Sequence, residues 1–339
     1  MNNFLGNRIT LLRHVLRRYR PAARTGQMEA AGVAATIDMV IQGTDERMRL
    51  VNGYRNKLTG AVTTAIEFTG SIIDQIPAAI DVSSNTFVSN PYVNAFFTNI
   101  DELQSVFSRS SELRDFIDDY HHHDIKEIYA LLCMHKTEKT ALGMELAGNT
   151  LKKDVCQIAV NFSDHHVYSP SPTEHETRQG LKNCLLEGLI TKALDRVVQL
   201  RLSRQHLEDQ QRILQARLRS RQTDQWDSLD NEKTREQLAQ IEKTMRDTPQ
   251  ASPLETLNEV KKVFTHPEEF VRLQRSSLRI DRMGIKRNED APETSNRLDL
   301  VEVTVGTDAP RVVSLARFPR NEVLPRIDIH EWTRKRMRV

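Results

Sequence analysis

The sequence predicts a mainly α-helical protein with long helices, including an antiparallel coiled-coil-like hairpin, and a small antiparallel β-sheet as a minor α+β part. Two observations lead to this prediction. Apolar residues recur at heptad or helical spacing over two long stretches, 28–76 and 181–246. By contrast, only three short runs alternate as strands do, at 154–162, 298–305 and 311–318.

Composition favours an elongated protein of a reducing compartment. The chain has 339 residues, 28% of them charged and only 6% aromatic, and this balance suits helical structures with much surface. At this length two or three domains are expected. No apolar run reaches about eighteen residues, so no transmembrane helix is predicted. The three cysteines, Cys133, Cys156 and Cys184, lie far apart in sequence, which favours free thiols and a cytoplasmic location.

The first 26 residues are basic and amphipathic. Residues 1–28 carry six arginines and no acidic residue. Three interpretations are open: a short helix that packs on the body, a helix that binds an anionic membrane surface, and a mitochondrial presequence. The membrane interpretation assigns contact with the anionic surface to Arg13, Arg17, Arg18 and Arg20. Residues 326–339 form a second basic segment, so both ends suit an anionic partner.

Residues 28–76 keep helical apolar spacing without a slip, which predicts one long helix. Five glycines interrupt it, and each costs a helix up to about 1 kcal/mol relative to alanine. The glycines therefore indicate either close approach of a partner helix or a bend. Pro77 ends the pattern.

The pattern of residues 101–143 predicts two or three further amphipathic helices. The strongest candidates for a chemically active site lie within them. If residues 118–127 are helical, Asp119, His123 and Glu127 share one face, as metal ligands could. A solvated helix junction and a pH-sensitive patch are the other interpretations. Because no recognised metal motif includes the His121–His123 cluster, we predict no metal site and no cofactor.

The second periodic stretch predicts the helical hairpin. Leu186, Ala193, Leu200, Leu207 and Leu214 recur every seven residues, and after a break at 223–228 a second row follows in Thr234, Leu238, Ile241 and Met245. We assign partner binding to Leu200, Leu207, Leu214 and Leu218. Seven arginines and two acidic residues lie between Arg196 and Arg221, which supports nucleic-acid binding as an alternative.

The remaining segments complete the predicted order. Ser252 and Thr265 each start a helix by a capping pattern, and the second of these helices contains Phe270, Val271 and Leu273. The predicted domains are a basic helix at 1–26, a helical domain at 27–150, a small α+β unit from 151–180 and 298–325, the hairpin with following helices at 181–283, a polar linker at 284–297 and a basic tail at 326–339.

No Walker A, GxGxxG, GxSxG or kinase pattern is present, so the chain is predicted not to be an enzyme. The favoured function is an interaction or scaffold protein that binds a partner protein, or a second copy of itself, through long amphipathic helices, with an anionic membrane surface as a further partner. The alternative is a nucleic-acid-associated protein that uses the arginine-rich helix 196–221. The third interpretation is a metal-dependent enzyme at residues 118–127.

Overall fold

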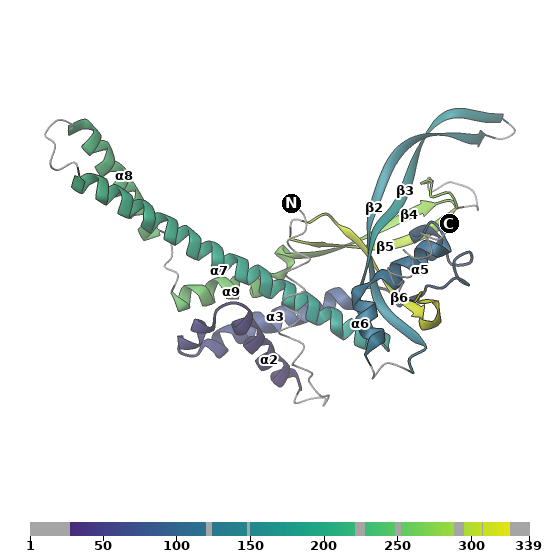
Figure 1. Ribbon diagram of the computed structural model, residues 1–339, viewed down its shortest axis with the longest axis horizontal. Coiled ribbons are helices and arrows are strands. Elements are labelled where there is room, and N and C mark those ends of the chain that lie inside the picture. The colour runs from purple at the N-terminus through teal and green to yellow at the C-terminus, as the bar shows by residue number, and fades with distance from the viewer. Residues whose placement is uncertain are drawn as a thin grey trace, which may run out of the picture.

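The computed structural model shows a body built around a sheet, from which a helical arm and a two-stranded β-ribbon extend in different directions (Figure 1). The structure describes residues 28–119, 124–147, 150–220, 228–247, 252–287, 295–306 and 308–325. The basic segments 1–26 and 326–339, with Arg13, Arg17, Arg18 and Arg20, lie outside the described residues. The predictions made for them therefore remain predictions.

The prediction of a mainly helical, coiled-coil protein with a small sheet is wrong. The described chain is 56% helical and 27% strand, and its strands form one large curled sheet. Neighbouring strands follow the order β3-β2-β6-β5-β4, all antiparallel, and β1 runs parallel beside β6. The strands are β1 Ile80–Asp81, β2 Glu127–Ala147, β3 Thr150–Ser171, β4 Val271–Ile280, β5 Asn296–Val305 and β6 Arg311–Pro319.

Strand β2 was predicted to be a helix because both of its faces are covered. Ile128, Ala130 and Leu132 are buried in the core on one face of the sheet, while Leu131 and Cys133 pack in the core on the other. A strand that is apolar on both faces loses the alternation that identifies strands, and apolar residues at 128, 131 and 132 also fit a helix. Long-range pairing with β6 decides the outcome.

The helix predicted to begin at Thr265 is also absent. Helix α9, Pro253–Thr265, starts at the Ser252 cap as expected, but Thr265 is its last residue. A short 3-10 turn, Pro267–Glu269, follows, and Val271 then opens β4. Likewise, residues 284–286 are not a free linker, because Val160 donates a backbone hydrogen bond to Gly284 and Lys286 donates one to Ile158.

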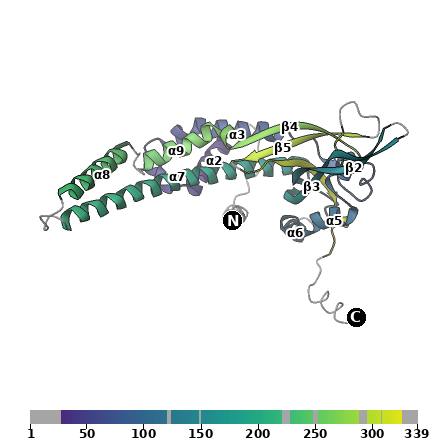
Figure 2. The ribbon, with the colours of Figure 1, turned by 90° about the horizontal axis from the view of Figure 1, so that it is seen from above.

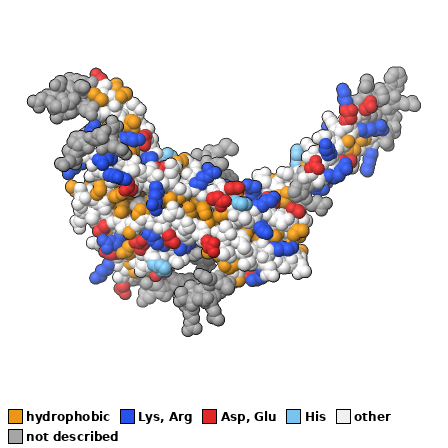
Figure 3. Space-filling model, turned by 180° about the vertical axis from the view of Figure 1, so that it is seen from behind, with side chains coloured by type: hydrophobic (Ala, Val, Ile, Leu, Met, Phe, Trp, Pro, Cys, Tyr) orange, Lys and Arg blue, Asp and Glu red, His pale blue; other side chains and the backbone are white. Residues whose placement is uncertain are grey.

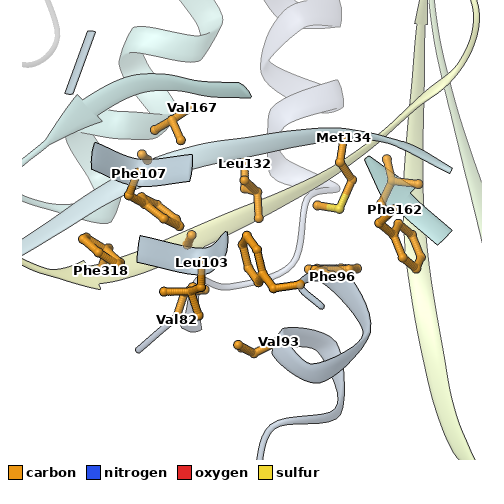
Figure 4. Close-up of a cluster of buried hydrophobic side chains, with 14 of the residues drawn as sticks. Val82, Val93, Phe96, Leu103, Phe107, Leu132, Met134, Phe162, Val167 and Phe318 are labelled. Carbon is orange, nitrogen blue, oxygen red and sulfur yellow. The ribbon is translucent and has the colours of Figure 1, made fainter. Parts of the chain in front are cut away.

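Helices cover both faces of the sheet. On one face lie three helices from residues 91–118, and Figure 4 shows Phe96, Leu103 and Phe107 facing Leu132 and Phe318. The ring centroids of Phe107 and Phe318 stack 4.1 Å apart. On the other face, the end of α3 and the start of α7 pack against β2, β5 and β6. The three helices are α4 Pro91–Phe96, α5 Ile100–Arg109 and α6 Ser111–Asp118.

The predicted single helix over 28–76 is two helices joined by a bend. These are α2 Met28–Gly43 and α3 Tyr54–Asp74, with a 3-10 turn at Glu46–Leu50 between them. Gly53 makes the bend possible, because its φ of 68° lies in the left-handed region that favours glycine. Gly43 serves close approach instead, since a Cβ there would collide with the side chain of Ile190 on α7.

The β2–β3 ribbon curls because β3 carries extra residues. At each of the three register shifts between the two strands, β3 has one residue more than β2. Left-handed residues of β3 lie at these shifts: Asp154, Asp164 and Ser169. Such bulges bend and twist a strand pair. Since β2 pairs with β6 only as far as Met134, the ribbon continues beyond the sheet (Figure 1).

Candidate partner-binding arm

The helical arm is the outer part of α7 with α8 packed along it (Figures 1 and 2). Helix α7 spans Glu174–Ser220, which corresponds to about 70 Å at 1.5 Å per residue, and α8 spans Ser228–Asp247. The inner part of α7 belongs to the body, because Leu189, Ala193 and Val197 are fully buried in a core shared with α2, α3 and α9.

Asp45 fixes the root of the arm. Its carboxylate caps the 3-10 turn by accepting a hydrogen bond from the backbone N–H of Arg47, and it pairs with the guanidinium groups of Arg47 and Arg201. Burial alone would raise the pKa of Asp45, but the hydrogen bonds from Arg47 and the charge of Arg201 hold that pKa below its usual value. The ion pair thus anchors α7 to the turn just where the helix leaves the body.

The predicted partner-binding leucines share a heptad face with residues that contact α8. Arg204 donates to the backbone carbonyl of Met245 over 2.7 Å, and Gln211 donates to Glu242 over 3.4 Å. The four leucines lie on that same face, and Leu214 is buried while the other three are half-buried: Leu200, Leu207, Leu214 and Leu218. This face therefore forms the contact between the two helices of the hairpin. Whether these leucines also bind another molecule stays a prediction.

The opposite face of α7 exposes a second apolar stripe, which the heptad count missed. Val198 is 39% exposed, and Leu202 and Ile213 are each 54% exposed. Their spacing of four and eleven residues keeps them on one side of a helix. The stripe is interrupted by Gln205 and Asp209, so the longer leucine row dominates the sequence pattern.

Many arginines of the predicted nucleic-acid-binding helix 196–221 have contacts within the chain. Arg196 lies 5.6 Å from the ring centroid of Phe270, Arg204 pairs with Glu208 over 3.0 Å, and Arg212 pairs with Asp209. Arg201 is held by Asp45 as described above. Basic side chains are spread along the arm among acidic and apolar ones (Figure 3). Several positive charges of this helix are therefore already paired with carboxylates of the same chain, which leaves fewer of them for nucleic acid.

A second polar cluster lies on β3, around Asp164. Asp164 accepts from Arg311 over 2.7 Å and is 3.1 Å from the Nε2 atom of His166. Cys133 lies on the neighbouring strand opposite His166. Burial raises the pKa of Cys133 to about 11, although Arg311 acts against this rise, so the group is a thiol near neutral pH and a poor nucleophile. The signal that could have found the cluster is Asp164-His165-His166.

The metal-binding geometry considered for residues 118–127 is not formed. Asp118 ends α6 and Glu127 begins β2, so Asp119 and Glu127 do not share a helical face. The His121–His123 cluster lies outside the described residues. Within the described ranges, no three His, Cys, Asp or Glu side chains converge as metal ligands. Nor is any helix in that part of the chain both long and apolar enough to cross a membrane.

No protein-family model, curated protein or solved structure matches this chain.

Proposed function

We propose that the chain is a non-enzymatic interaction protein that holds a partner protein against its helical arm. The observation that carries this proposal is the outer part of α7, which extends away from the body while presenting Leu202 and Ile213 to solvent, with Val198 on the same face at its root. Large apolar side chains that recur on one exposed helix face are typical of surfaces that another molecule covers.

The packing of the arm supports the same proposal. The body has its own cores around the sheet and around α2, α3 and α9, and these do not include the outer residues of α7 or any of α8. The seam with α8 contains the polar residues Arg204 and Gln211, so it contributes less apolar burial than a continuous leucine seam. The arm therefore contributes little to the stability of the body, and its main contribution is a surface that projects away from the body.

We also propose a reducing, cytoplasmic setting, with the basic segment 1–26 meeting an anionic membrane surface. The three cysteines are free thiols, which supports the first part. The second part rests on the sequence of that segment alone. A second copy of the chain is one partner that the arm could hold.

The experiment compares partners of the full chain with those of a shortened-arm variant, in which a short Gly-Ser turn replaces residues 202–247 and so removes Leu202 and Ile213 together with α8. We expect the variant to keep the melting temperature of the body and to lose a protein that co-purifies with the full chain at low salt. The substitution Leu142→Gln serves as a control, because Leu142 is an even more exposed apolar residue and lies on the β-ribbon, away from the arm. An unchanged set of partners in the shortened-arm variant would contradict the proposal.

A further inference from the structure

The exposed stripe of α7 lies opposite the seam that faces α8. At about 100° per residue, Val198, Leu202 and Ile213 fall within a sector of roughly 60°, and Ala216 falls within it too. By the same count, Leu200, Leu207 and Leu214 lie on the far side of the helix. The stripe from Val198 to Ile213 is about 22 Å long. That length matches a line of contact with one further helix of three to four turns.

The stripe has basic flanks. Residues 198–220 contain five arginines and two acidic residues, and Asp45 of the body holds Arg201, so two positive charges are left in excess. Both acidic residues already have an arginine partner: Glu208 pairs with Arg204, and Asp209 pairs with Arg212. Arg212 and Arg219 lie along one edge of the stripe by helical spacing, and Arg217 lies along the other. The arm is therefore apolar in the middle of this face and positive at its edges.

This pattern favours one class of partner. A membrane interface would need a wider apolar sector, and Asp209 lies near the middle line of this one. Nucleic acid would need aromatic or phosphate-facing groups in place of exposed Leu202 and Ile213. A helix with an apolar stripe and acidic flanks matches both features, because its apolar residues cover the stripe and its carboxylates face the arginines.

Resting on the proposed function, we infer that the outer face of α7, centred on Val198, Leu202 and Ile213, binds an acidic amphipathic helix of a partner protein. The leucines on the α8 side then hold the arm together, while the opposite face makes the contact. Apolar burial supplies the affinity, and the arginines set the charge preference of the site.

The test uses two synthetic helical peptides with the same leucine stripe. One carries glutamate at its flanking positions and the other carries lysine there. With the full chain, we expect fluorescence anisotropy to show at least about tenfold tighter binding of the glutamate peptide. A Val198→Gln/Leu202→Gln/Ile213→Gln variant should lose at least about tenfold of that affinity, whereas Leu142→Gln should keep it. Glutamine is a good helix former, so the arm itself should remain helical.

A second variant tests the preference of the site for an acidic helix. Arg212→Glu together with Arg219→Glu should weaken binding of the glutamate peptide and strengthen binding of the lysine peptide. Equal affinity for the two peptides, or affinity that the triple glutamine variant leaves unchanged, would overturn the inference. So would binding of phosphatidylcholine–phosphatidylserine vesicles or of duplex DNA that the glutamine variant abolishes while neither peptide binds.

These outcomes separate the inference from the proposed function. If neither peptide binds but the shortened-arm variant loses a co-purifying protein, the arm is an interaction element and its partner is of another class. If the glutamate peptide binds as expected and shortening the arm changes no partner, the face has the inferred chemistry but the proposed function fails.

Discussion

His165 ties the helical layer to the edge strand of the sheet. Its Nε2 atom donates to the backbone carbonyl of Phe96 over 2.8 Å, and its ring stacks on Phe97 at 5.1 Å between centroids. Burial lowers the pKa of His165, although the Phe96 carbonyl and the charges of Glu102 and Asp164 act in the opposite direction. The fold therefore prefers the neutral imidazole.

This preference predicts a pH dependence. Because the folded-state pKa of His165 lies below the unfolded value of about 6.5, its contribution to stability is fully present above that pH and is lost as the pH falls below it. Urea melts between about pH 7.5 and 5 should show this loss, and His165→Phe should remove part of the slope in that window. Equal slopes for the two proteins would contradict the assignment.

We predict opposite thiol reactivities for Cys133 and Cys156. Cys133 is buried under α7 with a raised pKa, while Cys156 is exposed on the ribbon. A maleimide near pH 7.5 should label Cys156 first and leave Cys133 unmodified until the protein unfolds. Peptide mapping by mass spectrometry distinguishes the two sites. Comparable labelling rates would mean that β2 is not covered as described.

Among the elements, the α7–α8 seam gives the most direct prediction. Replacing Leu200, Leu207 and Leu214 by alanine removes the larger apolar side chains of the seam. The cost is about 2–5 kcal/mol where the leucine is buried, as Leu214 is, and less at the half-buried positions. We expect the arm to loosen while the body keeps its melting temperature. Hydrogen exchange should rise in residues 204–218 and 234–245 but not in β5 and β6. Faster exchange throughout the sheet would contradict this separation.

Elements that the sequence predicts well carry their signal locally. The cap at Ser252 lies where α9 begins, and the alternating run 298–305 falls inside β5. A helix cap or a half-exposed strand can be recognised from neighbouring residues alone. Strand β2 could not be recognised in this way, because covering both faces is a property of the whole fold.

The candidate site was predictable only in part for a related reason. The heptad row shows that one face of α7 is apolar, but the sequence does not say what covers it. In the structure that face runs along α8, and Arg204 reaches the Met245 carbonyl at the end of α8. The shorter stripe of Val198, Leu202 and Ile213 can be recognised as a separate exposed face only once α8 is known to pack on the other side of α7.

At the scale of the molecule, strands from widely separated segments meet in one sheet, and α7 joins this sheet to the core of α2, α3 and α9. One continuous helix therefore links the β-sheet body to the arm (Figure 2). A force or contact at the outer end of α7 reaches the sheet through a single rigid element, with the Asp45–Arg201 pair at its root.

Small-angle X-ray scattering of the full chain and of the variant with residues 202–247 replaced tests the projecting arm most directly. Removing residues 202–220 from α7 shortens the arm by about 28 Å at 1.5 Å per residue. We predict that the largest dimension of the particle falls by roughly that amount, while circular dichroism shows only the loss of the removed helix. An unchanged largest dimension would mean that the arm lies against the body, and the account of α7 as a projecting partner-binding element would then be wrong.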